Sequence, residues 1–175
     1  MIMSSVVASH VSETEKTMSR FSVERYVETD TGHRVPNHKS KCRVLHGHRY
    51  RFTAKVSGEL VDTPGDSSEG MVIDFSDISR ILNEEVHDVV DHCTVLWRFD
   101  TLITCVNLRK EDCGGRLLIV DFIPTAENFA KWAYDRLKAP IEAVHTTLRL
   151  ESVSVRETPK SIASYPSILP VNRVL

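Results

Sequence analysis

The sequence predicts a single globular domain that combines β-strands with two amphipathic helices, in the order strand, strand, strand, helix, helix, strand. Three observations support this prediction. The chain has 175 residues, of which 41% are hydrophobic, so it can bury one core of useful size. Residues 46–56 alternate between two sets of side chains, which is typical of a strand. Two later segments, 75–92 and 124–140, carry apolar residues at the spacing of a helix.

The composition and the charge exclude several functional classes. The 22 basic and 24 acidic residues leave a formal net charge of -2, which gives no electrostatic footprint for nucleic acid or an acidic membrane. No apolar run approaches the ~18 residues of a membrane span. The first residues lack the basic segment and the long apolar stretch of a secretory signal. We therefore expect residues 1–19 to form a flexible polar tail and residues 20–175 to form the domain.

The first half of the chain is expected to supply three strands. Residues 20–30 mix β-branched and aromatic residues in rough alternation, and the segment that follows, with Gly32 and Pro36, is expected to be a loop or a broken strand. The second strand begins at His46, and its even-numbered positions share one inward face while the basic residues point to solvent. A turn-rich connection then leads to a short third strand at 70–75.

Two helices and a last strand follow. The first helix has Asp74 as its expected N-cap, and the second begins near Pro124 and ends at Pro140. The mixed segment between the helices is expected to hold a hairpin around Gly114 and Gly115. In residues 146–159 the apolar parity switches between Leu150 and Val153, which predicts a bulge or a bend. The expected buried positions are Ile78, Leu82, Val86 and Val89 or Val90 in the first helix, and Phe129, Trp132 or Ala133, and Leu137 in the second.

Two histidines on the inward face of the second strand indicate a metal site. A single buried histidine is more often satisfied by a hydrogen bond in the core. His46 and His48, two residues apart on one strand face, can instead converge on one ion, and imidazole is a favoured ligand of Zn²⁺. The third ligand would be His33 in the preceding loop, with His38 as the competing candidate. Three histidines leave one coordination position open, as in catalytic zinc sites.

Cys42 is the candidate reactive thiol. Most cysteines are small buried hydrophobes, but this one lies between Lys41 and Arg43, and positive charge near a thiol, including a zinc ion, favours the thiolate. The pair Asp91 and His92, at the end of the first helix, offers an orienting carboxylate and a proton carrier, although such pairs are common. The cysteines are scattered without a CxxC pair, which favours a reducing, cytoplasmic setting over a disulfide framework. They are Cys42, Cys93, Cys105 and Cys113.

An ordered set of short motifs resembles the 6-pyruvoyltetrahydropterin synthase superfamily, which has the tunnelling fold. The motifs are GHRVP, CRVLHGH, GMVIDF, DH at positions 91 and 92, PTAENFAKW and RETP, and they extend over roughly residues 21–165. Each motif is weak by itself, but the ordered set is specific. Three residues separate Cys42 from His46. That spacing resembles the queuosine-pathway 6-carboxy-5,6,7,8-tetrahydropterin synthases, whereas a longer gap is typical of the biopterin-pathway enzymes.

The sequence departs from the compact bacterial members of this family in two places. It carries a longer insertion at residues 97–123, and it has Trp97 where an asparagine often follows the DHxxL segment. Neither departure touches a motif residue. The insertion is expected to alter the rim of the site or an oligomer contact.

The resemblance implies the conversion of 7,8-dihydroneopterin triphosphate to 6-carboxy-5,6,7,8-tetrahydropterin, with loss of triphosphate and acetaldehyde, which makes the protein a carbon–carbon lyase. A zinc ion held by His33, His46 and His48 would bind and polarise the hydroxyl groups on the side chain of the substrate. Cys42 would act as the general base on a C–H group of the same substituent, because a thiolate near a cation can work at neutral pH.

The resemblance also assigns roles to four further residues. His92, oriented by Asp91, would relay or return the proton. Glu157 would anchor the pterin by accepting two parallel N–H bonds, a pattern that the edge of this heterocycle presents. Thr125 would contact the pterin as well. The plain alternatives are a solvated charge at a strand end for Glu157 and a helix N-cap for Thr125.

By the same resemblance the fold is α+β, with an antiparallel four-stranded sheet, two helices on one face and the inserted hairpin. Three subunits would close their sheets into a barrel and two trimers would stack into a homohexamer. Cys42 and Glu157 of one pocket could then come from different subunits. Two other functions stay open. One is a biopterin-type synthase that forms the pyruvoyl product, and the other is a non-catalytic, zinc-stabilised pterin- or purine-binding module.

Overall fold

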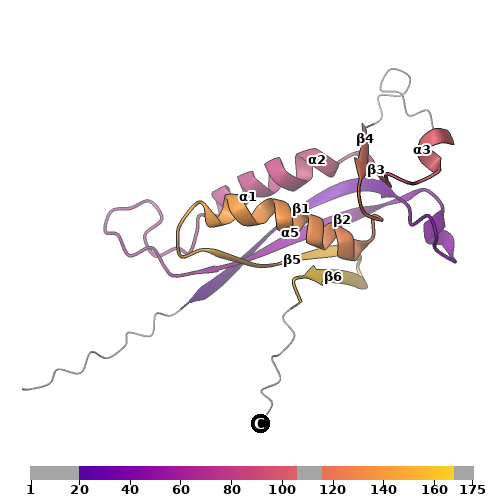
Figure 1. The fold of residues 1–175 in the computed structure, drawn as a ribbon. Coiled ribbons are helices and arrows are strands. Elements are labelled where there is room, and N and C mark those ends of the chain that lie inside the picture. Colours follow the sequence, from indigo (N-terminus) through magenta and orange to yellow (C-terminus); the bar gives the residue numbers. More distant parts are fainter. Residues whose placement is uncertain (1–19, 106–115, 168–175) are drawn as a thin grey trace, which may run out of the picture.

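The computed structural model describes residues 20–105 and 116–167, and a six-stranded sheet forms their centre (Figure 1). The strands are β1 Phe21–His33, β2 His46–Gly58, β3 Cys93–Trp97, β4 Arg116–Val120, β5 Arg149–Thr158 and β6 Ser161–Tyr165. Their spatial order is β4, β3, β1, β2, β5, β6. The pairs β1–β2, β2–β5 and β5–β6 are antiparallel, whereas β1–β3 and β3–β4 are parallel.

The predicted α+β class with two long helical segments is confirmed, but the predicted four-stranded antiparallel sheet is wrong. β3 and β4 extend the sheet beyond β1 as a parallel pair, and β6 extends it beyond β5. The strand after Gly114 and Gly115 was expected to belong to a hairpin, yet β4 pairs with β3 in parallel. The two glycines themselves lie outside the described residues. Parallel pairing needs a crossover and is set by contacts distant in sequence, so a local pattern does not reveal it.

The expected third strand at residues 70–75 is also absent. Val72 and Ile73 are each 5% exposed, so the segment is buried, but it only leads to the cap of the first helix. In the connection that leads to this segment, an isolated β-bridge joins Val61 and Glu69. A short apolar run does not distinguish a paired strand from a buried loop.

The first helical segment is divided into three parts. These are α1 Phe75–Leu82, a π-helical turn η2 Asn83–His87, and α2 Asp88–Val90. The carboxylate of Asp74 accepts a hydrogen bond from the backbone N–H of Ser76 at 2.7 Å, which confirms the predicted N-cap. The inward positions of this segment are the predicted Ile78, Leu82 and Val86, with Ile81 and, of the two alternatives, Val90.

The second helix, α5 Ala126–Glu142, begins as predicted and ends later than predicted. Thr125 caps it by accepting a hydrogen bond from the backbone N–H of Asn128 at 3.4 Å. Pro140 lies inside the helix rather than at its end. A proline lacks the N–H donor and its ring crowds the carbonyl group four residues earlier. Near the end of the helix these two effects do not stop the two residues beyond it from keeping helical geometry.

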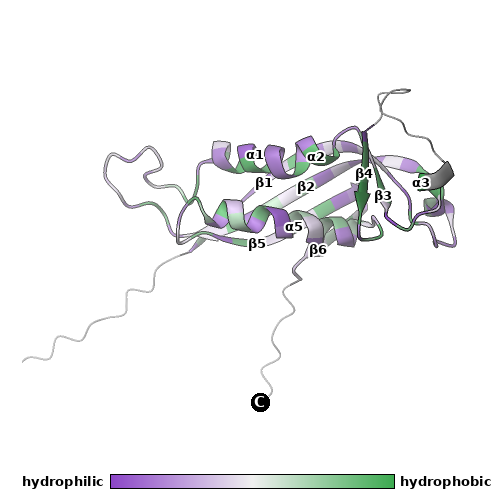
Figure 2. Ribbon diagram, turned by 45° about the horizontal axis from the view of Figure 1, so that its top comes forward, coloured by the Kyte–Doolittle hydropathy of each residue, from purple (hydrophilic) through white to green (hydrophobic). Residues whose placement is uncertain are grey.

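Both long helical segments lie on one face of the sheet, and the core fills the space between the two layers (Figures 1 and 2). The even-numbered positions of β2 face this core: Tyr50, Phe52, Ala54 and Val56 are all 0% exposed. Figure 2 shows the hydrophilic and hydrophobic residues that alternate along the strands. The predicted period of two in β2 is therefore confirmed.

The predicted irregularity in the last strand is confirmed as a bulge. Lys55 pairs with Ser152 and Val56 pairs with Leu150, so Glu151 is an extra residue on β5. The bulge explains why the apolar parity of the sequence switches there. Within the described residues, no helix is both long enough and apolar enough to cross a membrane.

Candidate active site

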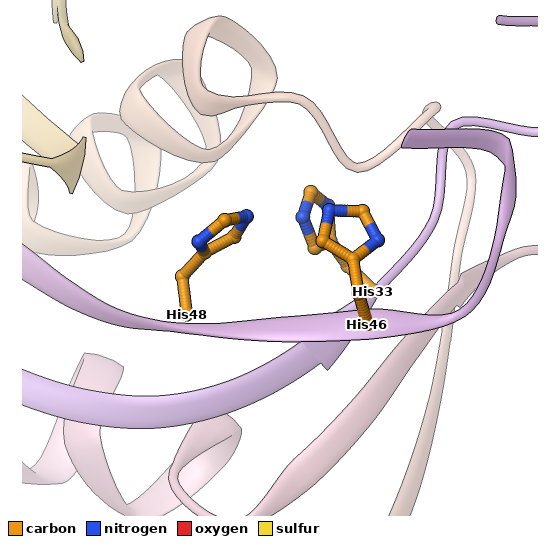
Figure 3. A group of neighbouring side chains, drawn as sticks. All are labelled: His33, His46 and His48. Carbon is orange, nitrogen blue, oxygen red and sulfur yellow. The ribbon is translucent and has the colours of Figure 1, made fainter. Parts of the chain in front are cut away.

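Three histidines gather where the paired ends of β1 and β2 meet. His33 is the last residue of β1, not part of a loop as predicted, and it lies directly opposite His46, while Thr31 lies opposite His48. One ring nitrogen from each histidine lies within 4.8 Å of the other two, and Figure 3 shows the rings grouped over one face of the strands. His38 is not part of this cluster.

The glycine between the two histidines of β2 has a steric reason. Gly47 lies opposite Gly32, where the two strands approach closely. A Cβ atom added to Gly47 would lie only 3.2 Å from the carbonyl oxygen of Thr31. A side group at this position would therefore force the neighbouring backbone of β1 to give by a few tenths of an ångström.

Backbone carbonyls fix the tautomers of two of the imidazoles. Nδ1 of His33 lies 2.6 Å from the carbonyl oxygen of Pro124, and Nδ1 of His46 lies 2.7 Å from that of Val44. A carbonyl can only accept, so each Nδ1 carries the proton and donates it, which leaves the lone pair on Nε2 available. This pattern is typical of histidines that bind a metal ion.

The chemistry of the three histidines fits a divalent metal such as zinc. Burial lowers the pKa of His33, and it also lowers the pKa of His48. Both imidazoles are therefore neutral near pH 7, the form that binds metal. A zinc ion about 2.1 Å from three nitrogens needs them roughly 3.4 Å apart. The three nitrogens lie within 4.8 Å of one another, so an ion would draw them closer together.

Tyr50 connects the histidines to Glu157, and the sequence reasoning missed it. Its hydroxyl lies 2.9 Å from Nε2 of His33 and 3.1 Å from Oε1 of Glu157, and its single proton can be donated to only one of these two acceptors at a time. Burial raises the pKa of Tyr50, and the neighbouring Glu157 carboxylate raises it further, so the hydroxyl keeps its proton. The signal was present in the sequence, because Tyr50 follows His46 and His48 on the same strand face.

Glu157 lies beside the Nε2 atoms of His33 and His48. Its Oε1 atom is 3.6 Å from Nε2 of His33 and 3.8 Å from Nε2 of His48. The Glu157 side chain is 26% exposed, so the carboxylate faces the open side of the site. It is therefore close to the histidines and also accessible to a small molecule.

A pocket of about 410 Å³, a size suited to a small organic ligand, is lined by His33 of the cluster. Cys42, on the short 3-10 turn η1 (Lys41–Arg43), lines this pocket together with Glu157 and Thr125. One subunit therefore places Cys42 and Glu157 at the same pocket, and the expected sharing of a pocket between subunits stays a prediction. Cys93 differs from Cys42: it is buried, and burial raises the pKa of its thiol.

Asp91 and His92 form a pair, but the structure does not bring them to Cys42. Nδ1 of His92 lies 2.8 Å from a carboxylate oxygen of Asp91, whose other oxygen accepts from the backbone N–H of Asp30 at 2.9 Å. Asp30 is an outward residue of β1, between the buried Thr29 and Thr31. The His92 side chain is 76% exposed, and neither member of the pair lines the pocket of Cys42.

Known proteins resemble this chain over most of its length. The sequence model of the 6-pyruvoyl tetrahydropterin synthase family matches residues 22–167. The 6-carboxy-5,6,7,8-tetrahydropterin synthase of Haemophilus influenzae is 28% identical over 83% of this chain and 98% of its own. The enzyme of the same name from Synechocystis is 32% identical over 81% of this chain and 92% of its own. The crystal structure of an uncharacterized protein from Wolinella succinogenes has the same fold, with a TM-score of 0.68 and 22% identity over 83% of this chain and 97% of that one.

Proposed function

The chain belongs to the 6-pyruvoyl tetrahydropterin synthase family, and we propose that it is a zinc-dependent lyase that converts 7,8-dihydroneopterin triphosphate into 6-carboxy-5,6,7,8-tetrahydropterin. Acetaldehyde and triphosphate would be released. The observation that carries this proposal is the cluster of three histidines, of which His33 lines the same pocket as Cys42 and Glu157. That arrangement supplies a metal site, a thiol and a carboxylate within one small volume.

His33, His46 and His48 would hold the zinc ion, which would act as a Lewis acid toward the oxygens of the substrate. Side chains around the zinc ion would bind the pterin ring. Glu157 would accept two N–H bonds from the pterin edge, and the Tyr50 hydroxyl supports it by donating to Oε1 at 3.1 Å. Thr125 lines the same pocket and would contact the pterin while it caps α5.

Cys42 would remove a proton from a carbon atom of the substituent on the pterin ring, and the pair of Asp91 and His92 would return it. In one subunit His92 is exposed and lies apart from Cys42, so we propose that it serves a pocket of a neighbouring subunit. The expected homohexamer, a dimer of trimers, would bring the two together. The site would then be completed only by assembly.

Mixing two inactive variants tests the shared site. Cys42→Ala and His92→Ala should each lose turnover by about two to four orders of magnitude, the usual worth of a positioned acid or base. Oligomers assembled from both variants in equal amounts should regain activity at about a quarter of their interfaces, where an intact Cys42 meets an intact His92. No recovery in oligomers shown to be mixed would place both residues in the site of the same subunit or remove His92 from the mechanism.

The relatives' names favour the carboxy product, and so does the gap between Cys42 and His46. We propose that the protein acts in queuosine (7-deazaguanine) biosynthesis, in the cytoplasm. The alternative is the pyruvoyl product for which the family is named. Mass spectrometry of the products formed from 7,8-dihydroneopterin triphosphate separates the two masses directly.

The same assay tests the zinc proposal and the non-catalytic alternative. Turnover should disappear with a chelator and return with added zinc, and Cys42→Ala should bind zinc but not turn over. A protein that binds pterin and zinc without any turnover would instead be a binding module. A protein whose turnover is unaffected by complete metal removal would contradict the zinc proposal.

A further inference from the structure

A buried ion pair lies outside the site described above, in the segment that the sequence identifies as an insertion. Asp100, in the turn between β3 and α3 (Leu102–Cys105), is 3% exposed. Its carboxylate binds the Arg34 guanidinium in a fork: Oδ2 accepts from Nε at 2.7 Å, and Oδ1 accepts from Nη2. Oδ1 also accepts from the backbone N–H of Leu102 at 2.8 Å.

Arg34 begins the loop that carries Cys42. The backbone N–H of Val35 donates to the carbonyl oxygen of Cys42 at 2.8 Å, which closes this loop on itself. Arg34 reaches the same turn with its guanidinium, since Nη1 lies 3.5 Å from the carbonyl oxygen of Arg43. Asp100 therefore fixes the Arg34 guanidinium beside the turn that carries the Cys42 thiol. In Figure 1 this loop and α3 lie at the same end of the sheet.

The turn η1 has few other attachments to the fold. None of its three residues is buried, and Ser40, which precedes it, makes no capping bond through its hydroxyl. The two residues that follow are exposed hydrophobics, Val44 at 61% and Leu45 at 41%. Apolar burial therefore contributes little to holding the turn. Its position depends on the hydrogen bonds from Arg34 and Val35, and on the bond from Nδ1 of His46 to the carbonyl oxygen of Val44.

We propose that Arg34 and Asp100 form a positioning pair that holds the Cys42 turn at the edge of the pocket. This inference rests on the proposed function of Cys42 and adds to it a role for the first part of the 97–123 insertion. A planar guanidinium fixed at two carboxylate oxygens has one orientation, which a single-point contact would not enforce. A reacting group that is misplaced by about 1 Å can lose roughly a hundredfold in rate.

Two variants break the pair in different ways. Asp100→Asn keeps the shape but turns an NH₂ group toward the guanidinium, and Arg34→Lys keeps the charge but loses the fork. The matched controls are Asp121→Asn and Arg98→Lys. They alter an ion pair of 2.8 Å in the same segment, in which Asp121 is 82% exposed and Arg98 is 52% exposed.

Hydrogen exchange and steady-state kinetics on zinc-loaded protein test the positioning pair. Hydrogen exchange of the amides of residues 35–45 should accelerate about tenfold in either pair variant, and exchange in β2 and in both controls should stay unchanged. Steady-state kinetics should show kcat reduced at least about tenfold while KM stays within about threefold, since the anchor and the metal ligands are untouched.

Unchanged exchange in both folded pair variants would overturn the proposal, and so would faster exchange with unchanged kcat. If Asp100→Asn does not fold, Arg34→Lys decides the matter by the same two measurements. A wild-type protein without turnover would refute the proposed function instead. The exchange measurement would then still decide whether the pair holds the turn, because it requires no substrate.

Discussion

Replacement of Glu157 by glutamine separates the possible roles of this carboxylate. The wild-type residue uses Oε1 to accept from Tyr50 and keeps its remaining acceptor capacity toward the pocket, where it is 26% exposed. In Glu157→Gln, the amide oxygen can still accept from Tyr50, so the NH₂ group must turn toward the bound pterin. That NH₂ group would face the N–H groups of the ligand, donor against donor.

The expected loss follows from the hydrogen bonds that change. A bond to a charged acceptor contributes about 1.5–3 kcal/mol, and a buried donor left unpaired adds a further penalty of similar size. We expect a net loss of about 2–4 kcal/mol in binding free energy, which corresponds to a dissociation constant roughly 30 to 1,000 times larger. Calorimetry with an unreactive oxidised pterin on zinc-loaded protein measures this change.

The control is Glu127→Gln, which removes one negative charge from a residue that lines the same pocket. It should bind the analogue almost as tightly as the wild type does. Equal affinity of Glu157→Gln and wild type would refute the anchor. A large loss of zinc in Glu157→Gln would show that the carboxylate, at 3.6 Å and 3.8 Å from Nε2 of His33 and His48, is a metal ligand instead.

The remaining predictions concern the metal site and its support. His48→Ala should lose most of its zinc by metal analysis while His38→Ala keeps it, and full retention in the first variant would contradict the ligand assignment. Tyr50→Phe should fold with about 1 kcal/mol less stability in urea unfolding and bind the pterin analogue several-fold more weakly, because Glu157 loses a donor; unchanged values would make that bond irrelevant. Burial lowers the pKa of His33 and His48 from 6.5. The histidines of the unfolded state therefore bind protons at a higher pH than those of the folded state. As the pH falls, the metal-free protein should lose stability between about pH 7.5 and 5.5. A stability that rises over the same interval would contradict this sign.

Local patterns in the sequence predicted the local parts of this structure. The alternation from His46 onward placed a strand and its buried face, and the caps Asp74 and Thr125 were recognisable because capping needs only a few neighbouring residues. The bulge at Glu151 left a change of parity that could be read directly. In each case the interaction joins residues that are close in sequence or that repeat with a fixed period.

Features that depend on distant contacts could not be predicted in this way. The five residues of β6 carry no strong alternation of apolar and polar side chains. They form a strand because their backbone pairs with the free edge of β5. The parallel strands β3 and β4 were missed for the same reason. At the site, the spacing of His46 and His48 indicated a metal and left His33 and His38 as candidates for the third ligand. The register of β1 against β2 places His33 beside the pair.

The π-helical turn η2 sets the angular position of everything that follows it in the first helical segment. Residues eight apart in a regular α-helix are about 80° out of line, yet Leu82, Val86 and Val90 all face the core. The wider turn absorbs this offset, as a spacer of one residue would. Loss of one exposed residue there, such as Glu84, would let the segment wind as continuous α-helix with the flanking parts still aligned. The same deletion in α1 would rotate Asp91 and His92 by about 100°.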